Sequence, residues 1–208
     1  MDKAVVVFVF FLLLCACKKE EKCIQKPPTP ISPSFVDWSK PYLTKPISYV
    51  RFKSNKGLEE SLEITSSIDP SKWYLKDNDN CLLNKGEWRE YNFKSTIFKK
   101  RFDMVLFQYS TNQTALGIIN RSGPMEESSI IFNNDGSNYV QYTPCDTCTQ
   151  YFKNYSINNV DYNEVVRVIC FKSLNALHSE VVEEIYFAKG FGLVRFIASD
   201  DTVWDIVN

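Results

Sequence analysis

After residue 46 the chain alternates apolar and polar positions with a period of two, which is typical of strands that bury one face. Residues 58–64 show this alternation, and residues 47–53 precede them across the turn sequence Ser54-Asn55-Lys56-Gly57. Two such runs separated by a short polar turn predict a β-hairpin. Further strand-like runs are expected at residues 88–97, 101–109, 114–120, 128–132, 137–143, 150–157, 164–171, 180–188, 192–197 and 202–207.

The short connections between these runs predict an antiparallel meander, because parallel strands need long crossover segments. Residues 165–171 are apolar on both faces and are interrupted only by Arg167. A strand of that kind lies between two layers, or lines a barrel that a helix or loop covers from outside. The expected fold class is all-β with little helix, as an open or closed barrel-like sheet or, alternatively, as a two-sheet sandwich.

The N-terminus has a different pattern, an unbroken apolar run over residues 4–14 that ends before the charged cluster 18–22. A helix that crosses a bilayer needs about 20 apolar residues. The run is shorter and has the length of the apolar region of a secretory signal peptide. We therefore expect a cleaved export signal over residues 1–16.

The end of this run, Leu14-Cys15-Ala16-Cys17, resembles the lipobox of bacterial lipoproteins. The resemblance implies that Cys17 carries the lipid, diacylglycerol with acyl chains such as palmitate, and becomes the mature N-terminus. Several acyl chains hold a protein firmly on a membrane. Because Lys18 stands where an inner-membrane retention signal has Asp, delivery to the outer membrane is favoured. Lys19-Glu20-Glu21 resembles a surface-export signal of Bacteroidota-type lipoproteins, and the choice between periplasmic and surface faces stays open.

Four prolines, at positions 27, 28, 30 and 33, favour an extended backbone that cannot join a sheet. Residues 17–34 are therefore expected to form a spacer, and residues 35–208 a single β-rich domain. In an alternative interpretation the region around Ile31 and Phe35 packs on the domain as an arm.

The C-terminal part carries a second resemblance. Residues 156–165, 184–195 and 203–207 are similar to the C-terminal meander of many uncharacterised Bacteroidota-type lipoproteins, which includes a Tyr-Phe-Ala-Lys-Gly-Xaa-Gly-Leu-Val hairpin. The resemblance implies a hairpin with no known activity. Gly190 and Gly192 fit its tight turn, because glycine adopts positive φ without steric cost.

Composition excludes some classes of partner. The formal net charge is −1, and lysine and arginine are spread along the chain without a basic stripe, which argues against nucleic-acid binding. The 15 Phe, 11 Tyr and 4 Trp residues indicate a substantial core. Trp38, Trp73, Trp88 and Trp204 could form a sugar-stacking platform, although such rings more often lie in the core.

Seven cysteines occur, of which Cys145 and Cys148 are separated by two residues. This spacing occurs in dithiol oxidoreductases, where a helix N-terminus lowers the thiol pKa. Here strand-like segments flank the motif, so a disulfide or paired thiols at a turn is favoured; free thiols, a redox pair and a metal site are the alternatives. Zinc needs four ligands, and no second pair of cysteines or histidines completes a set. We expect no metal and no cofactor.

Catalytic patterns are sparse. His178 is the single histidine, no Gly-x-Ser-x-Gly sequence occurs, and adjacent acidic residues on a strand point to opposite faces. The sequence therefore predicts an envelope lipoprotein that is not an enzyme and that binds an apolar or lipidic ligand in its concavity, a glycan or a partner protein. The alternatives are a thiol redox protein that uses Cys145 and Cys148, and a structural accessory of an outer-membrane assembly.

Overall fold

A computed structural model describes residues 27–42, 47–76, 83–95, 102–110, 112–120, 126–133, 139–142, 148–169 and 182–207. Residues 1–16, where a signal peptide is expected, lie outside these ranges, as do Cys17, Cys145 and His178. Within the described ranges, no helix has the length and apolar character that a bilayer-spanning helix requires.

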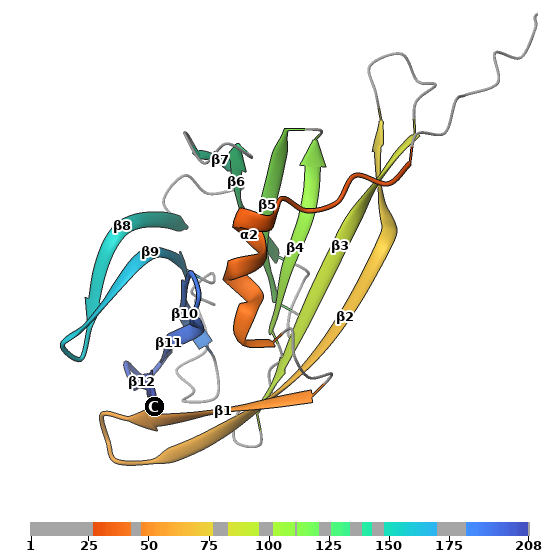
Figure 1. The fold of residues 1–208 in the computed structure, drawn as a ribbon. Coiled ribbons are helices and arrows are strands. Elements are labelled where there is room, and N and C mark those ends of the chain that lie inside the picture. The colour runs from red at the N-terminus through yellow and green to blue at the C-terminus, as the bar shows by residue number, and fades with distance from the viewer. Residues whose placement is uncertain are drawn as a thin grey trace, which may run out of the picture.

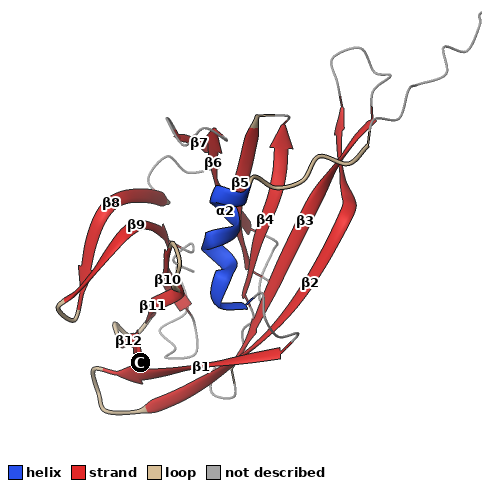
Figure 2. Cartoon of the chain, viewed as in Figure 1, coloured by secondary structure: helices blue, strands red, loops and turns tan. Residues whose placement is uncertain are grey.

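The molecule is built on one antiparallel sheet of 12 strands (Figures 1 and 2). The strands are β1 (Ile47–Ser54), β2 (Glu59–Lys76), β3 (Leu83–Lys94), β4 (Phe102–Ser110), β5 (Gln113–Asn120), β6 (Glu126–Asn133), β7 (Tyr139–Tyr142), β8 (Thr149–Ile157), β9 (Val160–Ile169), β10 (Val182–Ala188), β11 (Gly192–Ala198) and β12 (Val203–Ile206). Each strand-like run expected from the sequence has a counterpart among these strands, and most ends differ by a few residues, but β2 extends well beyond the expected end at residue 64. The all-β prediction is confirmed.

Two meanders, β1–β7 and β8–β12, share the sheet, and the pairing of β1 with β12 joins them. The consecutive strands β7 and β8 therefore form the two edges of the sheet. The sheet curls until these edges approach, since Phe132 of β6 and Tyr151 of β8 have ring centroids 5.9 Å apart. The result is a nearly closed barrel, so the two-sheet sandwich is wrong.

Two short helices occupy the inside of the curled sheet: α2 (Pro33–Val36) and the 3₁₀ helix η1 (Asp37–Tyr42) (Figure 2). Helices this short have too few residues to show a helical period in the sequence. Pro33 fits the first turn of α2, where its missing N–H leaves no hydrogen bond unmade. We call residues 29–42 the strap.

The structure supports the alternative interpretation of the spacer, in which the region around Ile31 and Phe35 packs on the domain. Ile31 and Phe35 are both buried in the main core, so packing begins ahead of residue 35. Thr29 forms a parallel bridge with Gly86 of β3. Pro27 and Pro28 are exposed.

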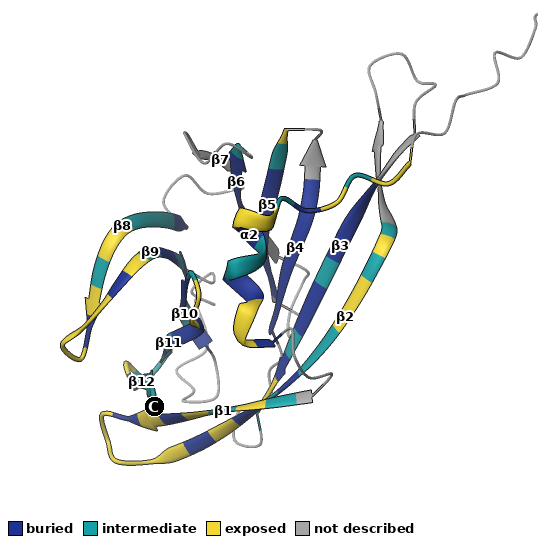
Figure 3. Cartoon of the chain, viewed as in Figure 1, coloured by how far each residue is buried: buried dark blue, intermediate teal, exposed yellow. Residues whose placement is uncertain are grey.

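The β8–β9 hairpin adds a second layer on the outer face of β10–β12. The side-chain amide of Asn158, at the hairpin turn, donates to Asp205 of β12, although β12 lies three strands away from β9 in the sheet. Ile157 accordingly shares a buried cluster with Val194. This layer explains why β9 is apolar on both faces: Val165 lies in the outer cluster and Val166 in the main core. Exposed positions concentrate at the hairpin turns and along one side of β2 (Figure 3).

Candidate functional site

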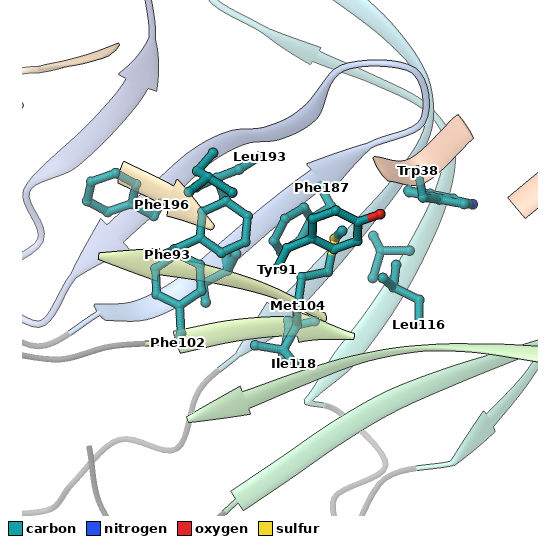
Figure 4. Packing of buried hydrophobic residues seen from close by; sticks show 14 of the residues in the cluster. Trp38, Tyr91, Phe93, Phe102, Met104, Leu116, Ile118, Phe187, Leu193 and Phe196 are labelled. Carbon is teal, nitrogen blue, oxygen red and sulfur yellow. The ribbon is translucent and has the colours of Figure 1, made fainter. Parts of the chain in front are cut away.

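The concavity of the sheet, where an apolar ligand was expected, is filled by aromatic side chains of the strap. Phe35 and Trp38 both pack on Phe132, with ring centroids 5.2 and 5.9 Å apart. Tyr42 lies edge-on to Phe93 at 5.6 Å. Figure 4 shows Trp38 beside the sheet residues of the same cluster. A ligand would have to displace the strap before it could enter this space.

Polar contacts hold the strap at its start and in its middle. At its start, the backbone N–H of Ile31 donates to the carboxylate of Glu87 at 3.0 Å, and the Glu87 N–H donates to the carbonyl of Thr29 at 3.0 Å. The Arg89 guanidinium lies 2.6 Å from the same carboxylate. In its middle, where η1 begins, the Gly190 N–H donates to the carbonyl of Asp37 at 2.8 Å. These bonds satisfy backbone groups that would otherwise be buried without partners.

Tyr42 makes the closest contact of the strap with the C-terminal hairpin. The backbone N–H of Leu193 donates to its hydroxyl oxygen at 2.6 Å. Burial raises the pKa of Tyr42 above its ordinary value, so the phenol is neutral at physiological pH and has a structural role.

An exposed apolar surface lies where the β8–β9 and β10–β11 hairpins meet. Phe191, in the β10–β11 turn, is 52% exposed, and its ring meets Tyr162 of β9 edge-on at 5.1 Å. Val160, two residues before Tyr162 on the same strand, is 36% exposed. Residues two apart on a strand share a face. We call the exposed Val160 and Phe191, together with Tyr162, which is 2% exposed, the Phe191 patch.

One ion pair borders the Phe191 patch on the side of β12. The Arg195 guanidinium binds both carboxylate oxygens of Asp205, with Nη2 at 3.0 Å from Oδ2. Asn158 donates to the same carboxylate. Burial raises the pKa of Tyr162, and the Asp205 carboxylate acts in the same direction. The bidentate geometry fixes this border, since both planar groups are locked together.

A second ion pair borders the Phe191 patch on the side of β8. Lys189 Nζ lies 2.6 Å from the carboxylate of Glu164, which also accepts a hydrogen bond from the Tyr151 hydroxyl at 3.1 Å. Glu164 has φ of +57°, a left-handed conformation that is rare for such a residue. The Glu164 carbonyl accepts a hydrogen bond from the Lys189 N–H at 3.0 Å, so Lys189 binds both the side chain and the backbone of Glu164. The turn that carries Phe191 is therefore rigidly placed.

A polar and aromatic ladder continues along the same outer face. Arg167 of β9 binds Glu184 of β10 through two hydrogen bonds, of 3.0 and 2.7 Å. Tyr186 donates to Glu184 at 2.8 Å and stacks on Tyr155. Burial, followed by the Glu184 contact, raises the pKa of Tyr186. Since these groups are paired with one another, the ladder braces the sheet.

Of the two cysteines singled out in the sequence, Cys148 lies in the described part of the chain. It is buried and takes part in a disulfide bond. Cys145, like the lipidation candidate Cys17, falls outside the described residues. A buried disulfide fits the structural interpretation better than a redox site, which needs an accessible sulfur.

The other sequence candidates do not gather into a site. Trp38, Trp88 and Trp204 are buried, so these three rings cannot form a sugar platform. Across the ranges that the structure describes, no three His, Cys, Asp or Glu residues are grouped so that they could hold a metal ion.

The sequence analysis does not identify the Phe191 patch. Gly190 and Gly192 account for the turn, with φ of +83° and +74°, and in the sequence Phe191 between them fits the turn without indicating any further role. The sequence feature that could have revealed the patch is a large apolar residue at a turn position, where polar residues are usual.

Comparisons with known proteins give no relative of this chain: no protein-family profile, no curated protein and no solved structure matches it.

Proposed function

We propose that this chain is a lipid-anchored envelope protein without catalytic activity, which binds a partner protein through the Phe191 patch. The lipobox resemblance at Cys17 supports the anchor. The observation that carries the binding role is the exposed, rigidly held Phe191, combined with a concavity that the strap already fills.

The chemistry of the patch favours a protein over a sugar. Protein interfaces have an apolar centre, often aromatic, within a polar border. The patch has this arrangement, with Phe191 at its centre and the Arg195–Asp205 and Lys189–Glu164 pairs at its edges. A sugar site would need polar side chains that are available for hydroxyl groups, and these four charged groups bind one another.

A photo-crosslinking amino acid placed at position 191 in living cells tests the binding role. We expect one discrete adduct with an envelope protein. Position 49 provides the matched control, because Tyr49 is 67% exposed on β1 and lies outside the patch. The same adducts from positions 191 and 49 would contradict the proposal.

Affinity for the purified partner gives the quantitative test. Phe191→Ser should weaken binding at least about 10-fold, the loss expected when an exposed aromatic anchor is removed. Tyr49→Ser should leave affinity unchanged. Equal affinities for the Phe191→Ser and unchanged proteins would exclude this patch as the contact.

The anchor has its own test. Cys17→Ser should abolish acylation, block signal processing and release the protein from washed membranes. Unchanged processing and unchanged membrane association would exclude Cys17 as the lipidation site.

A further inference from the structure

The turn that carries Phe191 is held from the outer face of the sheet and from its inner face. On the outer face, the Phe191 ring meets Tyr162, and Lys189 pairs with Glu164. On the inner face, the turn meets η1 of the strap, which lies against β11 (Figure 1). The position of the exposed ring therefore depends on the strap as well as on β9.

Two backbone N–H groups of this turn donate to the strap. The Gly190 N–H donates to the Asp37 carbonyl at 2.8 Å, and the Leu193 N–H donates to the Tyr42 hydroxyl oxygen at 2.6 Å. The two donors lie on either side of Phe191 in the chain. Because Leu193 and Tyr42 are both buried, loss of the hydroxyl would leave a buried N–H without its partner.

The Tyr42 ring also fits the hairpin closely. A Cβ atom added to Gly192 would overlap the Tyr42 hydroxyl oxygen and its ring. The same ring packs edge-on against Phe93 at 5.6 Å, and Phe93 packs against Phe187 of β10 at 5.8 Å. Figure 4 shows Phe93, Phe187 and Leu193 in this one cluster. Because protein interiors are closely packed, a shift of Tyr42 is transmitted to both β10 and β11.

The first part of the strap is held by other strands. The Ile31 N–H donates to Glu87 of β3, and the Phe35 ring packs on Phe132 of β6. The two hydrogen bonds with the turn come instead from η1, through Asp37 and Tyr42. The contacts that keep the strap inside the sheet can therefore be changed separately from those that hold the turn.

We propose that Asp37 and Tyr42 position the Phe191 patch, so that docking of the strap on the β10–β11 turn and binding of a partner protein at Phe191 favour each other. This inference rests on the proposed binding role of the patch. A turn that has lost its contacts with the strap binds more weakly, because only the ordered fraction of the molecules is competent to bind. By linkage, a bound partner stabilises the docked strap to the same extent.

The full-length protein in detergent tests the positioning without any partner. Tyr42→Phe removes the hydroxyl that accepts from Leu193 and keeps the ring. We expect exchange of the Leu193 amide hydrogen to become about 10-fold faster, the change that corresponds to one lost hydrogen bond. A fluorinated phenylalanine at position 191 reports on the turn, and its fluorine NMR signal should shift or broaden in the same variant.

Phe35→Leu is the matched control, because it removes a strap ring that packs on Phe132 and leaves the Tyr42 hydroxyl in place. A general loss of stability speeds exchange throughout the sheet, so exchange at Leu193 is compared with exchange at Val105, a buried residue of β4. Phe35→Leu should leave that ratio and the fluorine signal unchanged. An unchanged ratio and signal in Tyr42→Phe would overturn the positioning role.

Photo-crosslinking from position 191 in living cells tests the coupling to binding. At equal protein levels, Tyr42→Phe should lower the yield of the adduct at least about 5-fold, and Phe35→Leu should keep it. An equal yield from Tyr42→Phe and from the otherwise unchanged protein overturns this inference and leaves the patch as the binding site. The absence of any adduct from the unchanged protein overturns the binding role, and this inference with it.

Discussion

The hydroxyl oxygen of Tyr42 lies 2.6 Å from the backbone nitrogen of Leu193, a residue 151 positions later in the chain. A Cβ atom added to the adjacent Gly192 would lie 2.1 Å from the same oxygen. The end of the strap and the β10–β11 hairpin are thus fitted to each other at a point where a side chain has no room. Gly192 serves both the turn and the docking of the strap.

Gly192→Ala should destabilise the protein much more than Gly190→Ala. Both glycines have positive φ, which costs alanine about 1–2 kcal/mol. At Gly190 no atom lies within 4 Å of the added Cβ, whereas at Gly192 the Tyr42 ring must move, which adds about 1–3 kcal/mol. Urea unfolding of the two variants measures the difference. Equal losses would contradict the close approach of Tyr42.

Trp38→Ala should show that the strap is part of the core. Trp38 is fully buried against Phe132, and removal of such a ring costs about 3–5 kcal/mol. Tyr49→Ala, at an exposed position, should change stability by less than about 0.5 kcal/mol. Thermal unfolding compares the two. A Trp38→Ala protein as stable as the Tyr49→Ala control would mean that the strap adds no stability.

The Asp200 carboxylate, in the β11–β12 turn, should make a contribution to folding stability that depends on pH. Its carboxylate accepts from the Thr202 N–H and pairs with Lys56, and hydrogen bonding from Thr202 lowers its pKa below the usual 3.8. A lowered pKa favours the folded state when the group is ionised. The contribution is therefore complete well above pH 3.8, and it is lost as the pH falls through that value and then through the lower pKa of the folded state.

Asp200→Asn should accordingly cost about 0.5 kcal/mol at pH 7, a small value because the pair is partly exposed, and less near pH 2. Urea unfolding at both pH values measures this change. A cost that is the same at pH 2 and pH 7 would exclude the ionised carboxylate as its cause.

The disulfide of Cys148 is open to direct mapping. Peptide mass spectrometry without reduction should recover Cys148 in disulfide-bonded form, as an internal loop of one peptide if Cys145 is its partner, because its sulfur is bonded and buried. The spacing in the sequence predicts Cys145 as the partner. The thiol redox alternative predicts instead that both cysteines react rapidly with alkylating reagents in the folded protein. Rapid alkylation of Cys145 and Cys148 would therefore contradict the structural interpretation.

The sequence predicted the strands because their information is local. The alternation over residues 58–64 and the turn at 54–57 define β1 and β2 without reference to any other part of the chain. The glycines at 190 and 192 likewise define the β10–β11 turn, since only backbone freedom is needed there. The length of β2 beyond residue 64 was not predicted, because Pro70 and the following residues interrupt the alternation.

The sequence by itself determined the all-β class, the strand order along the chain, the turns and the expectation of an anchor at Cys17. Tertiary structure alone decided that the sheet closes around the strap, because Phe35 and Trp38 meet Phe132 across about 100 residues of chain. It also decided that Phe191 lies exposed beside Tyr162. Such contacts depend on how distant strands are brought together, and no local pattern of polar and apolar residues encodes that arrangement.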